Sequence, residues 1–98
     1  MWRHGDVMID RCAEIPADLR RTPGLILARG EATGHAHRVL EAGTAVVFDT
    51  GDGGFLDVTA DEATVVHEEH DAITLPRGTY RFWFQREYSP EAIRRVVD

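Results

Sequence analysis

Short β-prone runs separated by glycine or proline breaks recur along the chain, and this pattern most constrains its fold. The expected strands cover residues 6–10, 24–29, 35–40, 45–49, 55–59, 64–67, 72–75 and 79–88. The glycines between Thr50 and Gly54 predict a hairpin turn, and Pro76-Arg77-Gly78 predicts another. This many short strands predicts an all-β domain, either a small barrel or a β-sandwich. We favour the barrel, because closure removes exposed strand edges.

The longest predicted strand runs from Thr79 to Tyr88 and alternates in character. Its aromatic face, which we expect to be buried, carries Tyr80, Phe82 and Phe84. Beyond it, Ser89-Pro90-Glu91 combines an N-cap serine, a first-turn proline and an acidic residue. These signals predict a short C-terminal helix that docks on the β-domain through an apolar face.

Length and composition narrow the class of protein. The 98 residues predict one domain over 1–98, with 43% hydrophobic and 29% charged residues as in ordinary globular proteins. A net charge of −6 argues against a nucleic-acid partner. No apolar run reaches the ~20 residues of a membrane span. The N-terminus lacks a signal-peptide pattern, and Cys12 is the one cysteine, so we expect a cytoplasmic protein.

Four of the five histidines form two tight clusters. His35 and His37 are two apart, so on a strand they share a face, and Glu41 has the same parity. His67 and His70 have opposite parity, so either a bulge re-aims one of them or only one is a ligand. We slightly prefer His70, because the segment after it leads into the predicted Pro-Gly turn.

Imidazole is the commonest side-chain metal ligand, and a divalent ion needs several such groups. The two clusters can supply them only if their strands meet in space. The sequence therefore predicts a site for zinc, iron, nickel or manganese between those strands, with the metal identity left open. The competing interpretation is a pair of surface histidines on an edge strand and a second pair on a solvated acidic edge.

The segment from His35 to Glu41 resembles the first motif of the cupin superfamily, H-x-H-x(3,4)-E, and Pro76-Arg77-Gly78 resembles the P-x-G of the second. Cupins are small metal-binding β-barrels. The resemblance implies that His35, His37 and Glu41 are metal ligands. Arg81 stands where the family has a later histidine, so this ligand would have to come from His67 or His70.

Further features concern partners. Arg81 and Gln85 share a strand face and predict a pocket for a small polar or anionic ligand. His4, near the terminus, is expected to be solvated. We expect no membrane partner, and a homo-oligomer is left open, as is whether the metal supports a reaction on a small polar substrate. The alternative function is a non-catalytic accessory or interaction module that binds a protein partner through its acidic surface.

Overall fold

The computed structural model describes residues 1–29 and 34–84, and within these ranges every regular element is a β-strand. The strands are β1 (Trp2–His4), β2 (Val7–Arg11), β3 (Ile26–Arg29), β4 (Ala36–Val39), β5 (Ala45–Asp49), β6 (Gly53–Val66) and β7 (Ile73–Phe84). The all-β prediction is confirmed. The predicted C-terminal helix lies outside the described residues. The described part contains no helix long and apolar enough to cross a membrane.

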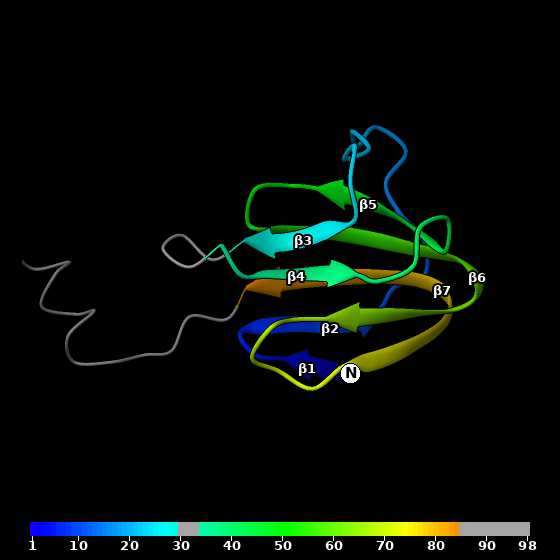
Figure 1. Cartoon of the computed structure of the whole chain (residues 1–98). Helices are drawn as coiled ribbons and strands as arrows, with labels where there is room; N and C mark the ends of the chain where they lie inside the picture. The colour runs from blue at the N-terminus through cyan, green and yellow to red at the C-terminus, as the bar shows by residue number, and fades with distance from the viewer. Residues whose placement is uncertain (30–33, 85–98) are drawn as a thin grey trace, which may run out of the picture.

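All seven strands belong to one antiparallel sheet (Figure 1). The main path is β1-β2-β7-β6-β4-β3, and β5 also pairs with β6. Strand β6 is therefore the branch point of the sheet. Residues 54–58 of β6 pair with β5, and its last residues, Val65 and Val66, pair with β4.

Strands β6 and β7 form one long hairpin, where the sequence predicted four shorter strands. The predicted turn at Pro76-Arg77-Gly78 is wrong, because these residues lie inside β7. Pro76 pairs with Glu62, at the edge of a register shift between Val58 and Glu62. A proline, which has no amide proton to donate, is tolerated next to such an irregularity. The break signal thus marks a bend in a strand rather than its end.

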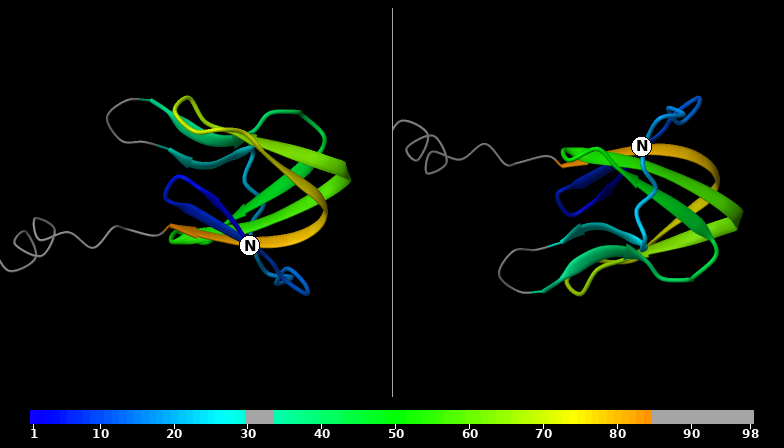
Figure 2. Two further views of the ribbon diagram at one scale, coloured as in Figure 1. Left: turned by 90° about the horizontal axis from the view of Figure 1, so that it is seen from below. Right: turned by 90° about the horizontal axis from the view of Figure 1, so that it is seen from above.

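The sheet bends back on itself, so that β1 and β2 face β3 and β4 across the fold (Figure 2). Strands β1 and β3 lie at opposite ends of the hydrogen-bonded path and do not pair with each other. The sheet is therefore strongly curved but not closed, and the closure that we favoured is not found in the described residues. The two facing edges meet instead through side chains.

The core lies between the facing parts of the sheet. Its fully buried side chains include Ile9, Leu56, Leu75 and Tyr80. Phe82 is also buried, as the predicted alternation of β7 requires, and Phe84 packs at the edge of the core. The hydroxyl of Tyr80 donates a hydrogen bond to the carbonyl of Pro76, which satisfies its polar tip.

Candidate metal centre

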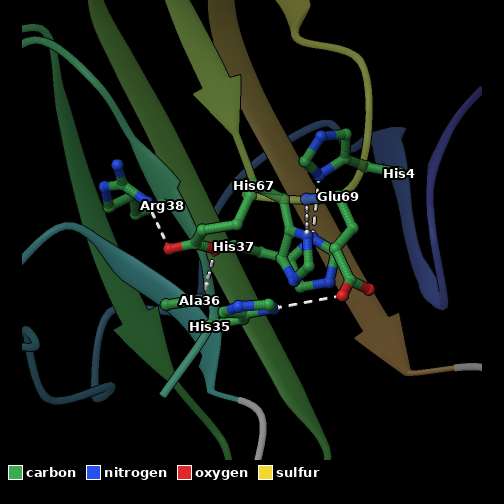
Figure 3. Close-up of polar contacts among 8 residues, drawn as sticks. His4, His35, Ala36, His37, Arg38, His67 and Glu69 are labelled. Atoms are coloured by element: carbon green, nitrogen blue, oxygen red, sulfur yellow. Dashed lines mark hydrogen bonds and ion pairs between the residues drawn. The ribbon is translucent and has the colours of Figure 1, made fainter. Parts of the chain in front are cut away.

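All five histidines gather in one place, and Figure 3 shows four of them pointing toward one another. His4 ends β1 and His37 lies in β4, with His35 just before that strand. His67 and His70 lie in the connection from β6 to β7. Ring centroids are separated by 4.3 Å for His37–His67, 4.7 Å for His67–His70, 4.9 Å for His4–His37 and 5.7 Å for His35–His67. The fold thus brings together the two clusters seen in the sequence.

Within residues 1–29 and 34–84, two groups of side chains have the spacing of a candidate metal site. One is His37, His67 and His70, and the other is His35, His67 and Glu68; within each group the ligand atoms all lie within 4.8 Å of one another. Nitrogens that share an ion at bonds of ~2.0–2.1 Å lie roughly 3 Å apart, so the side chains of either group would move closer together on binding one. Both groups contain His67, so a single ion would use one of them.

On the buried side of the cluster, the rings of His4 and His37 are in contact. Nδ1 of His4 lies 2.8 Å from Nδ1 of His37, and the two residues are 2% and 5% exposed. Burial lowers the pKa of His4 below its ordinary value, and the neighbouring His70 and His67 lower it further, while the backbone of Asp71 acts in the opposite direction. Among the described residues, none makes a hydrogen bond of normal geometry with Nε2 of His4.

His37 is the most perturbed of the histidines. Burial, together with the nearby rings of His4 and His67, lowers the pKa of His37 to about 4. Its Nε2 lies 3.3 Å from Oδ1 of Asp6, an exposed carboxylate that favours the protonated ring without overcoming the burial. At neutral pH His37 is therefore a neutral imidazole, the form that binds a metal ion.

On the accessible side of the cluster, residues of the β6–β7 connection contact the rings of His67 and His35. Nδ1 of His67 accepts a hydrogen bond of 3.0 Å from the amide of Glu69. The Glu69 carboxylate in turn lies 3.5 Å from Nδ1 of His35, an ion pair whenever that ring is protonated. His67 is half-buried and His70 is exposed, so the cluster is reached from solvent on this side.

Glu68 ties the β6–β7 connection to β4. Its carboxylate accepts hydrogen bonds from the amide of Ala36, at 3.1 Å, and from the guanidinium of Arg38, at 3.2 Å (Figure 3). Hydrogen bonds from its own amide and from that of Ala36 lower the pKa of Glu68. Both carboxylate oxygens are already engaged, which favours the group of His37, His67 and His70 as the ion site.

Gly5 makes room for one of the rings. It has a positive φ of 65° in the turn between β1 and β2, a conformation that favours glycine. A Cβ at this position would lie 2.5 Å from Nε2 of His70. The absence of a side chain therefore lets the imidazole of His70 approach the backbone.

Two other predicted site residues, Glu41 and Arg81, lie apart from this cluster. Glu41 accepts hydrogen bonds from the amide and hydroxyl of Thr64, which lower its pKa, and it belongs to neither group of candidate ligands. Arg81 is exposed on β7, with its guanidinium 4.7 Å from the centre of the Trp83 ring. Gln85 lies outside the described residues. Of the predicted metal ligands, the fold therefore brings together His35, His37, His67 and His70.

The sequence interpretation of His4 was wrong, because it is among the most buried residues of the chain rather than solvated. Its role depends on β1, which the sequence analysis did not predict. One signal was present in the sequence, because Trp2 and His4 share a parity. In the structure, Trp2 packs edge-on against Tyr80, with ring centroids 5.5 Å apart. An aromatic residue two positions before a histidine is consistent with a strand whose inner face carries both.

Chemically, the cluster is a set of imidazole nitrogen donors with one buried and one accessible side. Three such donors leave coordination positions for water or a small ligand. The carboxylates of Asp6 and Glu69 lie next to the rings and would offset the charge of a cation. The site is thus suited to a divalent transition-metal ion.

A family model described as a domain of unknown function (DUF8820) matches residues 3–85, so the chain belongs to that family. A search of the curated proteins and a search of the solved structures each found no significant match. The family description adds no activity, and the cupin resemblance remains a prediction.

Proposed function

We propose that this DUF8820-family protein binds one divalent transition-metal ion through His37, His67 and His70. The observation that carries the proposal is the spacing of their ligand atoms, all within 4.8 Å of one another. The three rings come from two parts of the chain about thirty residues apart, yet they converge at the accessible side of a buried cluster. A shared ion is a physical reason for so many imidazoles to be gathered.

The types of donor atom indicate which metal ions the site favours. Imidazole nitrogen suits zinc, iron and nickel, and manganese prefers more oxygen ligands, which Asp6 is near enough to His37 to supply in part. With open positions, a bound ion can polarise a small polar ligand or activate water. We propose a ligand of this kind at the ion. The cytoplasm stays the proposed location.

Metal analysis of protein purified without a histidine tag tests the proposal. After equilibration with zinc, nickel, iron or manganese and removal of free ion, near-stoichiometric metal is expected. The double variant His67→Ala/His70→Ala should lose it. Absence of metal with every ion tried would refute the proposal and favour the interaction-module alternative.

Glu41→Gln is a matched control that separates two ligand sets. The cupin resemblance makes Glu41 a ligand, whereas in the structure its carboxylate is bound to Thr64. Because the amide oxygen of glutamine can still accept from Thr64, this variant should fold and bind metal as the parent does. A large loss of affinity would instead support the cupin-like ligand set.

The amide of Glu69 provides a second readout. A neutral ring carries one proton, so an Nδ1 that accepts from this amide leaves the proton of His67 on Nε2. An ion at Nδ1 would replace the amide, and an ion at Nε2 would move the ring proton to Nδ1. Either way the amide loses its acceptor, and its ¹H–¹⁵N resonance should shift on metal addition.

A further inference from the structure

His37 is the middle of a three-residue chain of polar contacts. Its Nδ1 lies 2.8 Å from Nδ1 of His4, and its Nε2 lies 3.3 Å from Oδ1 of Asp6. His4 and Asp6 flank Gly5 in the turn from β1 to β2, so one hairpin contacts both nitrogens of a ring on β4. These three contacting residues also connect the two facing edges of the open sheet.

The ring protons of His4 and His37 can be arranged in two ways. Two ring nitrogens at 2.8 Å form a hydrogen bond only if one carries a proton and the other a lone pair. In the first arrangement His4 donates to His37, and Nε2–H of His37 faces the carboxylate of Asp6. In the second arrangement His37 donates from Nδ1 to His4, and Nε2 of His37 carries a lone pair.

The metal-free protein favours the first arrangement. It pairs the Nε2 proton of His37 with a carboxylate, a charge-assisted contact. It also leaves a lone pair at Nε2 of His4, a nitrogen that makes no hydrogen bond of normal geometry with any described residue. The second arrangement instead places an N–H at Nε2 of His4, where the backbone of Asp71, whose contact raises the pKa of His4, offers an uncharged and therefore weaker acceptor.

An ion requires the second arrangement. Nδ1 of His37 is turned to His4 inside the fold, so Nε2 is the nitrogen left to bind a cation. In the first arrangement Nε2 carries a proton and offers no lone pair. Both arrangements hold two ring protons, so the exchange between them releases none.

Resting on the proposed function, we infer that His4 is a positioning residue of the metal centre. It accepts the Nδ1 proton of His37 when Nε2 binds a divalent cation, and so fixes the orientation and tautomer of that ligand. At the same step Asp6 changes from a carboxylate that faces an N–H group to a negative charge beside the bound ion. Partners of this kind on the second nitrogen of a ligating histidine typically contribute 10–100-fold to metal affinity.

Long-range ¹H–¹⁵N spectra of histidine-labelled protein test the tautomer directly. We expect the His37 proton on Nε2 without metal and on Nδ1 after addition of one equivalent of Zn²⁺. A zinc-bound His37 that keeps its proton on Nε2 overturns the inference. This measurement needs no variant, so it stands even if a substitution at the buried position 4 prevents folding.

Titration of Zn²⁺ into three variants tests the energetic role. His4→Phe keeps an aromatic ring but removes the acceptor, and should weaken Zn²⁺ binding by about 10–100-fold while one ion per chain is retained at saturation. His4→Asn, whose amide oxygen can accept from Nδ1–H, should recover part of the affinity. Asp6→Asn should weaken binding by a smaller factor, because it removes a charge but leaves the His4 contact in place.

Each other result has a distinct meaning. Unchanged affinity in His4→Phe overturns the positioning role but leaves the proposed function standing. Loss of the bound ion itself in both His4→Phe and His4→Asn makes His4 a ligand and also overturns the inference. A parent protein that binds no Zn²⁺ or other divalent ion refutes the proposed function before any variant is made.

Discussion

Burial, more than any charged neighbour, decides the protonation states of His4 and His37. Desolvation lowers the pKa values of both His4 and His37, and the carboxylate of Asp6 beside His37 does not reverse the effect. A neutral imidazole can bind a cation. A protonated imidazole, in contrast, is unfavourable in a buried position. The same side chains therefore make the fold sensitive to acid.

The metal-free protein should lose stability as the pH falls from about 6.5 to about 4. Above 6.5 the His37 ring is neutral both folded and unfolded; between the two values only the unfolded chain takes up the proton, which favours unfolding. The shift to about 4 corresponds to a loss of up to about 3 kcal/mol from His37 alone. Urea unfolding at a series of pH values measures it, and His37→Gln should flatten the profile.

A single glycine controls access of His70 to the site. Gly5→Ala places a methyl group against the His70 ring, so metal affinity should fall as well as stability. Gly43→Ala is the control: Gly43 also has a positive φ, of 82°, but a Cβ there meets nothing within 4 Å. Both variants should lose about 1 kcal/mol of stability through backbone strain. Equal metal affinity in the two variants would contradict the role given to Gly5.

Among the elements, the long β6–β7 hairpin organises the molecule, since β2, β4 and β5 all pair with it. Its connecting residues carry His67 and His70, and Glu68 ties that connection to β4. Predicting β7 from its alternation was successful because one face of a half-buried strand must be apolar. Its continuation from Ile73 through Pro76 was not predicted, because the irregularity opposite Pro76 is accommodated by pairing with β6.

Phe82→Ala should destabilise the protein by about 3–5 kcal/mol, because the ring is 3% exposed in the core cluster. Trp83→Ala, on the opposite face of the same strand, should cost less, since Trp83 is only partly buried and stacks with the exposed Arg81. Chemical denaturation of both variants gives the comparison. A loss below about 1 kcal/mol for Phe82→Ala would mean that β7 presents its other face to the core.

At the scale of the whole molecule, the histidine cluster joins parts of an open sheet that backbone pairing does not connect. Strands β1 and β4 lie far apart in the hydrogen-bonded order, yet His4 and His37 are in contact. An ion bound by His37, His67 and His70 would tie β4 to the β6–β7 connection in the folded state. Binding should therefore be linked to global stability.

The melting temperature should rise on addition of zinc or nickel at neutral pH, and the gain should shrink below about pH 6, where protons compete for imidazole. Calorimetry with and without metal measures the gain. His67→Ala/His70→Ala should abolish it while keeping the metal-free fold, because neither ring belongs to the buried core. A double variant that gains as much stability as the parent would show that the ion binds elsewhere.

The sequence by itself determined the all-β class, the buried face of β7 and the four histidines worth attention, because these depend on local periodicity and residue chemistry. Only the tertiary structure decided that the sheet stays open, that Glu41 binds Thr64 and that His4 joins the cluster. Those outcomes depend on which distant strands face each other. Pairing of this kind is set by burial and register over the whole chain, and no short stretch of residues encodes it.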